Sequence, residues 1–434
     1  ADYGAENVES TFRSCYAGEE EHGSVRLPRS AGGKGRREAD EANKPAEVEA
    51  IEAFLFSQAE FRHNVITHHC EIRWTEEAGF LPLTDRDVNT LWGRMNKTVG
   101  RVYLTDIYNV IHSEFVPLFN PFQSYFDHLP SWDGVSDPIG DLADTVHVKS
   151  DQAEFRDYFR KWFVGILPAL LDDTVVNHEI LVLIGEQGLY KTTWFNFLLP
   201  PELRCYFYTK TNSDRLNKDD LFSLTEFALI CFEELDGMRP AELNQLKAMV
   251  TMPYVNERAA YGRNKERHPH IASFCGTGNN VQFLTDPTGN RRWLPFEVSQ
   301  IRDPHLHAIP YELVYSQAYA LWKSGFCHWF SQEEIRKLNM HNSRFEVPNL
   351  EEDLIRTHFR KPFEGEAGIF VTAADILEQI SSCLRYPLSP NKIGRIMAGL
   401  EFESIRYKGK RGYIAVKKTG EDIDRERRSG ALGL

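Results

Sequence analysis

One segment constrains this chain more than any other: residues 181–193, which read LVLIGEQGLYKTT. An apolar run rich in β-branched residues ends at Gly185, and the pair Lys191 and Thr192 comes just before an apolar, helix-compatible segment. Strand, glycine-bearing loop, lysine–hydroxyl pair and helix, in this order, are the parts of a phosphate-binding loop. Backbone N–H groups at a helix N-terminus point at the anion, and the helix dipole favours it. The segment predicts a bound nucleotide; the alternative is an ordinary strand–turn–helix with a surface lysine.

The loop residues expected around the phosphates are Gly185, Glu186, Gln187, Gly188, Leu189, Tyr190, Lys191, Thr192 and Thr193. Lys191 can reach the terminal phosphates, while the Thr192 hydroxyl can hold Mg²⁺. The pattern G-x-x-x-x-G-K-[ST] has glycine where Tyr190 stands. Because tyrosine tolerates positive φ poorly, Tyr190 has either a negative φ or a strained backbone.

Two adjacent carboxylates follow a second apolar run, in residues 227–236 (FALICFEELD). A continuous apolar run of strand length suits a central parallel strand buried on both faces. Glu233 and Glu234 stand at its C-terminal end, where α/β folds bind ligands. We assign Glu233 to the metal and Glu234 to the attacking water. Aspartate is usual at the first position, so this division stays open, and the pair could instead begin a solvated loop.

Two further segments carry polar residues that suit a phosphate site. Residues 271–280 form an apolar segment that ends in polar residues, and one of these, Asn279, carries an amide that could orient water beside a γ-phosphate. Residues 284–293 form a turn that presents Arg291 and Arg292 before another strand-like run. An arginine that enters a neighbouring subunit's site can stabilise charge on the transferring phosphoryl group. The alternative is a pair of surface arginines in salt bridges of little energetic value.

In order, the segments GEQGLYKTT, ICFEELD, MPYVNERAAYGR, SFCGTGNN and DPTGNRRW resemble the virulence-associated protein E family over about residues 100–300. This family consists of ATPases of mobile elements and phages, related to superfamily 3 helicases and to the helicase parts of primase-helicases. The resemblance implies ATP and Mg²⁺ as cofactors. It places the Walker A lysine and threonine at 191 and 192, the Walker B acids at 233 and 234, the sensor asparagine at 279 and the finger arginine at 291 or 292. Tyr190 departs from the general pattern, which implies a slower or altered nucleotide cycle.

Basic residues that could contact nucleic acid lie in two places, although 50 basic against 63 acidic residues give a net charge of −13. Arg263, Lys265 and Arg267 surround a plausible hairpin tip before the sensor, where superfamily 3 helicases grip single-stranded DNA. Tyr261 nearby suits backbone tracking. In the alternative interpretation, Arg258 and Arg263 make subunit-interface or γ-phosphate contacts.

The second basic group lies near the C-terminus. Residues 371–380 and 389–400 have helical patterns, and Ser389 with Pro390 forms a strong helix start. Two strands are expected over 402–416 around a turn at 408–412. Helix, helix and basic hairpin outline a winged helix. Its basic residues are Lys392, Arg395, Lys408, Lys410 and Arg411. We favour nucleic acid as the partner, with protein docking as the alternative.

The remaining composition excludes several classes of protein. No apolar stretch approaches the roughly 20 residues of a membrane span. The seven cysteines have no C-x-x-C spacing, which predicts free thiols in a reducing cytoplasm, with Cys231 and Cys275 in the core. The group His63, His68, His69 and Cys70 does not match common zinc spacings.

The sequence thus predicts an α/β fold: a P-loop AAA+ or RecA-like ATPase core with an N-terminal α+β region and a C-terminal winged helix. The expected segments are a disordered tail or linker (1–47), an accessory domain (48–150), the ATPase core (151–303), a helical segment (304–360), a winged-helix-like domain (361–418) and a charged tail (419–434). The expected function is an ATP-dependent DNA helicase or translocase, acting as a hexameric ring in replication of a mobile element or prophage. One alternative is a nucleotide-gated DNA-binding or protein-recruiting assembly with weak or no motor activity. Another is a primase-helicase whose primase domain is not in these residues.

Overall fold

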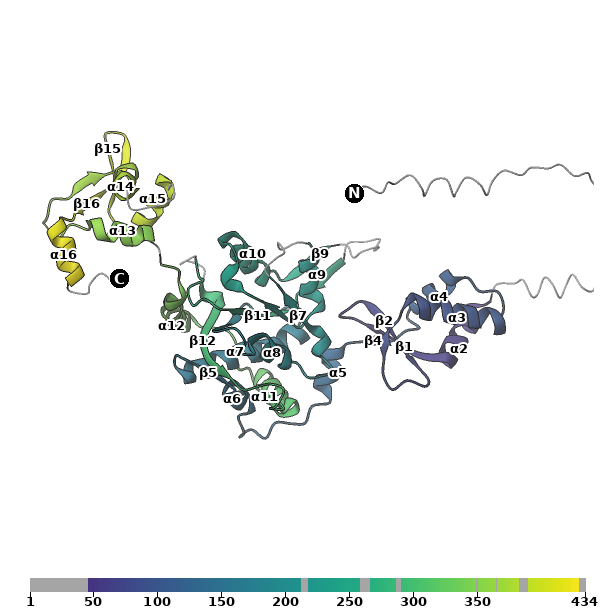
Figure 1. The fold of residues 1–434 in the computed structure, drawn as a ribbon. Coiled ribbons are helices and arrows are strands. Elements are labelled where there is room, and N and C mark those ends of the chain that lie inside the picture. Colours follow the sequence, from purple (N-terminus) through teal and green to yellow (C-terminus); the bar gives the residue numbers. More distant parts are fainter. Residues whose placement is uncertain are drawn as a thin grey trace, which may run out of the picture. The chain divides into compact units, whose positions relative to one another are not determined.

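The structure is a computed structural model of a mixed α/β chain with several sheets (Figure 1). It describes residues 46–211, 218–257, 266–285, 290–348, 350–363, 365–381 and 389–428, so the tail expected over 1–47 lies almost entirely outside the described residues. The chain divides into two units between Phe119 and Asn120. Among the described residues, no helix combines the length and the apolar character needed to cross a bilayer.

The N-terminal unit packs three helices against a four-stranded sheet. The helices are α2 (Val48–Gln58), α3 (Asp85–Thr98) and α4 (Leu104–Ile111). The sheet has the order β3-β2-β1-β4, with β1 (Ala59–Asn64), β2 (His69–Trp74), β3 (Leu81–Pro82) and β4 (Leu118–Phe119). Strands β1 and β2 form an antiparallel hairpin, and the Asn64 side chain accepts the backbone N–H groups of Ile66 and Thr67 in its turn. Cys70 contacts His63 across this hairpin, with the Sγ and Nδ1 atoms 3.6 Å apart.

A six-stranded sheet of order β5-β12-β6-β11-β8-β7 forms the centre of the second unit. Its strands are β5 (Val146–Val148), β6 (Ile180–Ile184), β7 (Phe207–Lys210), β8 (Leu229–Phe232), β11 (Ser273–Gly278) and β12 (Trp293–Ile301). All neighbours are parallel except β5, which is antiparallel to β12. Every residue of β6, β8 and β11 is buried, as the apolar runs predicted. Cys231 and Cys275 are buried register partners inside this sheet.

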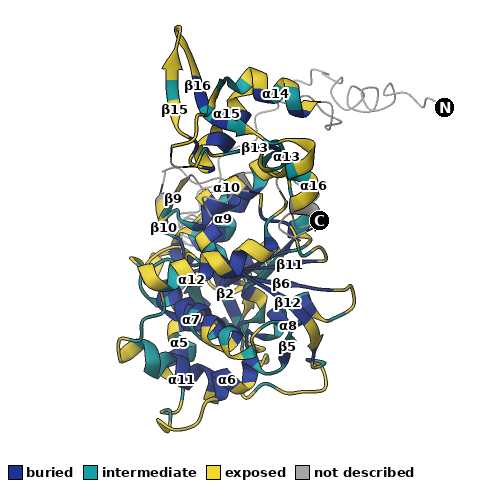
Figure 2. Cartoon of the chain, turned by 90° about the vertical axis from the view of Figure 1, so that its left-hand side faces the viewer, coloured by how far each residue is buried: buried dark blue, intermediate teal, exposed yellow. Residues whose placement is uncertain are grey.

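Helices cover both faces of this sheet (Figure 1). On one face, α7 (Gln152–Leu171) contributes a row of buried aromatic side chains, and the Trp162 indole donates to the Phe274 carbonyl of β11. Helices α8 (Lys191–Phe197) and α11 (Tyr311–Lys323) join it through aromatic contacts with Phe159 and Phe163. On the other face, α9 (Lys218–Glu226) and α10 (Pro240–Val250) pack on the side chains of β6, β8 and β11. Figure 2 shows the resulting buried layer around the sheet.

Residues 120–150 pack with the central sheet, and not with the N-terminal region to which the sequence pattern assigned them. They form α5 (Pro121–Asp127), α6 (Pro138–Ala143) and the edge strand β5. Gln317 of α11 accepts the backbone N–H of Ile139 at 2.8 Å, which fixes the start of α6. After α11, α12 (Gln332–Asn342) packs on β12, where His341 contacts the Pro295 carbonyl at 2.6 Å.

The C-terminal region has a core of its own. Its elements are α13 (Leu350–His358), β13 (Phe359–Arg360), β14 (Ile369–Val371), α14 (Ala373–Ser381), α15 (Pro390–Gly399), β15 (Ser404–Tyr407), β16 (Lys410–Lys417) and α16 (Gly420–Arg428). The Ser389 hydroxyl caps α15, as the sequence predicted. The hairpin turn is shorter than the expected 408–412. It contains only Lys408 and Gly409, which both have positive φ and therefore allow a two-residue turn.

Candidate functional site

The loop after β6 is shaped by three unusual backbone positions. A Cβ at Gly185 would lie 2.9 Å from the Val298 carbonyl oxygen, so only glycine fits there without a shift. Gly188 has a φ of 87°. Tyr190 has a φ of 59° and a ψ of 19°, and so lies in the left-handed region immediately before α8. Of the two alternatives left open for Tyr190, the structure has the strained one.

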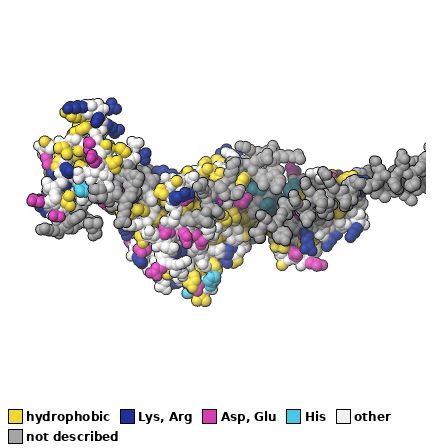
Figure 3. All heavy atoms as spheres, turned by 45° about the horizontal axis from the view of Figure 1, so that its top comes forward, with side chains coloured by type: hydrophobic (Ala, Val, Ile, Leu, Met, Phe, Trp, Pro, Cys, Tyr) yellow, Lys and Arg dark blue, Asp and Glu magenta, His cyan; other side chains and the backbone are white. Residues whose placement is uncertain are grey.

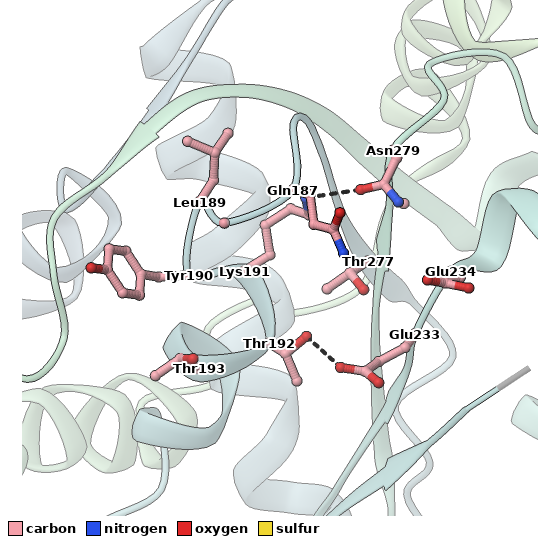
Figure 4. Close-up of a pocket in the computed structure, with 12 residues that line it drawn as sticks. Gln187, Leu189, Tyr190, Lys191, Thr192, Thr193, Glu233, Glu234, Thr277 and Asn279 are labelled. Atoms are coloured by element: carbon pink, nitrogen blue, oxygen red, sulfur yellow. Dashed lines mark hydrogen bonds between the residues drawn. The ribbon is translucent and has the colours of Figure 1, made fainter.

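Lys191 begins α8 and is almost entirely buried, with 8% of its surface exposed. Its amine donates to the Gly185 and Glu186 carbonyl oxygens, each at 2.7 Å, and to Asn279 Oδ1 at 3.4 Å. Burial lowers the pKa of this amine, and the nearby Asp236 carboxylate offsets part of that effect. The lysine therefore joins the loop to the strand end that carries Asn279 (Figure 4).

Both glutamates follow β8 at the carboxyl edge of the sheet. The Thr192 hydroxyl donates to Glu233 Oε1 at 2.8 Å, which joins the first turn of α8 to the end of β8. The Glu233 backbone N–H donates to the Lys210 carbonyl of β7, so Glu233 still follows the strand direction. Glu234 has a φ of 53°, which turns the chain sharply into the short helix η2 (Leu235–Gly237). The backbone is therefore strand-like at Glu233 and left-handed at Glu234.

Asp236 was not singled out from the sequence, although it lies three residues after Glu233. Its carboxylate accepts the backbone N–H groups of Asn279 and Asn280, at 3.2 and 3.0 Å. The η2 turn can approach β11 this closely because position 276 is glycine, where a Cβ would meet Leu235 Cδ1 at 2.2 Å. Asp236 thus clamps the loop after β8 to the loop after β11. In the sequence, Asp236 could have been noticed only as a third acidic residue in the FEELD segment.

These residues surround one cleft of about 400 Å³ at the carboxyl edge of the sheet. The described residues that line it are Gln187, Gly188, Leu189, Tyr190, Lys191, Thr192, Thr193, Glu233, Glu234, Thr277, Gly278 and Asn279. In Figure 4, the two glutamates and Asn279 lie on one side, with Leu189 and Tyr190 on the other. A cationic amine, a hydroxyl and two carboxylates in one cleft form a set of groups suited to a phosphate with a divalent metal ion.

Comparison with known proteins identifies the family of this chain. The model of the virulence-associated protein E-like domain matches residues 127–347, more than half of the 434 residues. The chain belongs to this family. Every residue of the cleft lies inside the span that matches the virulence-associated protein E-like domain. The C-terminal region beyond α12 lies almost entirely outside it.

Solved structures of the NrS-1 C-terminal region are among those similar to this chain. An apo structure is 12% identical, covers 86% of this chain and 99% of its own, and has a TM-score of 0.45. An A form apo structure of the same region is 13% identical, with the same coverage and a TM-score of 0.43. No curated protein matches this virulence-associated protein E family member.

Arg291 and Arg292 lie at the opposite edge of the sheet from the cleft. They belong to the short helix η3 (Asn290–Arg292) that precedes β12. Trp293, the next residue, pairs with Ile180 at the start of β6, whereas the cleft lies beyond the end of β6. The structure therefore does not bring these two arginines to the cleft of this chain.

Of the hairpin residues expected to contact nucleic acid, Arg263 and Lys265 lie outside the described residues, as do Arg258 and Tyr261. The strands that lead to this tip are an antiparallel pair, β9 (Tyr254–Glu257) and β10 (Glu266–Pro269). Arg267 lies on β10, with its guanidinium 3.4 Å from the centre of the Tyr254 ring. Strands β9 and β10 are therefore paired on either side of residues 258–265, which lie outside the described residues.

The basic residues expected in the C-terminal region differ in their contacts and in their exposure to solvent. Lys392 on α15 makes an ion pair with Glu351 of α13, while Arg395 on the same helix is exposed. Lys408, Lys410 and Arg411 are exposed on the β15–β16 hairpin. Arg406, which was not among the basic residues expected from the sequence, is the register partner of Arg411 across the hairpin. Figure 3 shows basic side chains gathered at this end of the region.

Proposed function

We propose that this member of the virulence-associated protein E family is a P-loop ATPase of the AAA+ type that acts as a DNA helicase or translocase in the replication of a mobile element or prophage. The observation that carries the proposal is the convergence of Lys191, Asn279 and the Thr192–Glu233 pair on one cleft. Those groups follow three different strands, so their meeting depends on the parallel pairing of β6, β11 and β8.

The strand order also supports an ATPase core. Strand β11 lies between β6, which leads to the phosphate loop, and β8, which leads to the carboxylates. The strand that leads to Asn279 therefore lies between the strands that lead to the lysine and to the glutamates, and Asn279 contacts the lysine. This is where an amide can contact both a terminal phosphate and the water that attacks it.

The oxygen donors present fit Mg²⁺, which prefers a hydroxyl, a carboxylate and phosphate oxygens to an all-protein cage. Thr192 and Glu233 would hold the ion, which when bound would neutralise charge on the terminal phosphates. Lys191 would bind the phosphate oxygens by exchanging its two carbonyl partners for them. Glu234 would accept a proton from the attacking water, and Asn279 would orient that water.

The position of Arg291 and Arg292 favours a site shared between subunits. They lie at the amino edge of the sheet, so they could stabilise a transferring phosphoryl group only in the site of a neighbouring chain. A closed ring provides one such neighbour for every site. A hexameric ring is part of the proposal.

DNA is the proposed partner on two grounds. The β9–β10 hairpin carries Arg267 stacked on Tyr254, which is the combination of cation and aromatic ring that tracks a nucleic-acid backbone. The order α14, α15 and the β15–β16 hairpin supports a winged helix in the C-terminal region. Its hairpin carries Arg406, Lys408, Lys410 and Arg411.

A second candidate is a nucleotide-gated assembly that binds DNA or recruits proteins without motor activity. The strained Tyr190 before Lys191 favours it, because an altered loop could slow the nucleotide cycle. The two candidates differ in whether single-stranded DNA stimulates ATP hydrolysis and whether the protein unwinds a duplex.

The test measures ATP hydrolysis with and without single-stranded DNA, together with the mass of the protein in solution. Lys191→Ala should abolish hydrolysis, and the double variant Arg291→Ala, Arg292→Ala should bind ATP without hydrolysing it. Mixing the two inactive proteins should restore part of the activity if the site is shared. Unchanged turnover by Lys191→Ala would remove the loop from the mechanism.

A further inference from the structure

Tyr190 occupies a backbone conformation that disfavours its own side chain. A bulky residue in the left-handed region costs roughly 1–2 kcal/mol relative to the right-handed one, and glycine would avoid that cost. Such outliers cluster at ligand sites, where the surrounding structure maintains them. Two facts therefore need a common explanation: the left-handed backbone of Tyr190 and its position in the lining of the cleft.

Polar and apolar residues lie on opposite sides of the cleft. Glu233, Glu234 and Asn279 lie on one side, where Asn279 contacts the amine of Lys191, and Tyr190 and Leu189 lie on the other (Figure 4). Leu189 and Tyr190 are the only described lining residues with a large apolar surface. The Tyr190 ring points away from the carboxylates, and the residue keeps 42% of its surface exposed.

The direction of a bound nucleotide follows from this division. Metal ion and terminal phosphate belong beside the carboxylates and Lys191, since those are the groups that bind them. The nucleoside, at the other end of the triphosphate chain, must then lie on the side of Tyr190. Nucleobases present flat apolar faces, and an exposed aromatic ring is the group that stacks on them.

We infer that the Tyr190 ring is the stacking platform for the nucleobase of the bound nucleoside triphosphate. This inference rests on the proposed function and adds the means by which the site holds the nucleoside. Because every base has an apolar face, a stacking platform is tolerant of base identity. The site is accordingly a general nucleoside triphosphate site, with weak preference between ATP and GTP.

The test compares two ligands, Mg·ATP and Mg·tripolyphosphate, on the full chain by calorimetry. Tripolyphosphate carries the phosphates without a nucleoside, so it reports the loop alone. Tyr190→Ala should weaken ATP and GTP binding by roughly tenfold and leave tripolyphosphate binding unchanged. Tyr190→Phe should retain the affinity for ATP, and Tyr190→Gly should lose it although glycine relieves the backbone. Tyr407→Ala, which removes a tyrosine of similar exposure far along the chain, is the matched control without effect.

Three results would overturn the inference. Equal loss of both ligands in Tyr190→Ala would mean that the side chain only shapes the loop. Retained ATP affinity in Tyr190→Ala, with wild-type protein binding both ligands, would remove the ring from the nucleoside site and leave the proposed function standing. If the wild-type protein binds neither ligand, the proposed function fails, and the inference fails with it.

Discussion

The Thr192 hydroxyl donates a hydrogen bond to Glu233 Oε1 at 2.8 Å. This bond distinguishes two carboxylates that are adjacent in the sequence. Glu233 continues the direction of β8 and is tied to the phosphate loop, whereas Glu234 turns away with a φ of 53°. The hydroxyl and the first carboxylate together form the oxygen pair to which a divalent cation would bind. Substitution of Glu233 and substitution of Glu234 should therefore have different effects on ATP hydrolysis.

We expect Glu233→Gln to raise the Mg²⁺ concentration needed for half-maximal ATP hydrolysis, because an amide is a weaker ligand than a carboxylate. Glu234→Gln should lower kcat by roughly 10²–10⁴-fold while ATP binding is retained, since it removes only the proton acceptor. Steady-state hydrolysis across a Mg²⁺ titration measures both effects. Glu297→Gln is the matched control, because Glu297 pairs with Lys149 on the same sheet and does not line the cleft. An exchange of the two phenotypes would reverse the assignment of Glu233 and Glu234.

Asp236 should act as a positioning residue. Asp236→Ala removes both bonds to the Asn279 and Asn280 N–H groups and should lower kcat more than ATP affinity, because the misplaced group is the sensor and not the phosphate loop. The free energy of unfolding should fall by about 1–3 kcal/mol. Asp236→Asn keeps one accepting oxygen and should recover part of the activity. Denaturant unfolding and ATP titration, run on the same preparations, separate the two effects. An equal loss of affinity and kcat would point to a general collapse of the site.

Removing two arginines from the basic β15–β16 hairpin should affect thermal stability and DNA binding in opposite directions. Arg406 and Arg411 face each other across β15 and β16, and like charges in that arrangement repel. Replacing both with alanine should leave thermal stability unchanged or slightly higher. The same change should weaken DNA binding and reduce the slope of log affinity against log salt by about 0.7 for each single-strand phosphate that the protein no longer neutralises.

Fluorescence anisotropy of a labelled oligonucleotide at several salt concentrations measures this slope. The matched control is Arg425→Ala on α16, which removes an exposed arginine from the same region outside the hairpin. If the control weakens binding as much as the double variant, the hairpin has no special role and only net charge matters.

Local patterns predicted the elements of the cleft because each depends on a short segment. The buried strands follow from uninterrupted apolar runs, and the cap of α15 follows from Ser389 and Pro390. The meeting of Lys191, Glu233 and Asn279 at one edge follows from parallel strands, whose carboxyl ends share an edge. The pattern of residues thus named most of the residues that line the cleft, but not Thr277 or Gly278, and it included Gly185 and Glu186, which do not line it. The roles of these residues stay predictions.

What the sequence could not predict depends on packing between distant segments. Asp236 becomes a clamp only because η2 packs on β11, and that approach needs Gly276 opposite Leu235. Likewise, Tyr190 has a positive φ that tyrosine disfavours, so the residue type alone could not predict it. The grouping of residues 120–150 failed for the same reason, because β5 pairs with a strand about 150 residues later in the chain.

His270 makes the stability of the chain sensitive to acid. It follows β10, is only 2% exposed, and its Nδ1 lies 2.7 Å from the Met252 carbonyl oxygen. Burial lowers its pKa from 6.5 to about 4. Above pH 6.5 the imidazole is neutral in both the folded and the unfolded chain, so it adds no pH dependence. Between pH 6.5 and about 4 the unfolded chain binds the proton and the folded chain does not, so the free energy of unfolding falls as the pH falls.

This histidine should therefore contribute a loss of about 3 kcal/mol between pH 7 and pH 4. His270→Gln, whose amide can still donate to the Met252 carbonyl, should reduce the acid sensitivity by that amount. Urea unfolding at half-unit pH steps measures the difference between variant and wild type. His307→Gln, at an exposed position, is the control and should retain the wild-type pH dependence. Parallel curves for wild type and His270→Gln below pH 6.5 would show that His270 takes up its proton as easily in the folded chain as in the unfolded one.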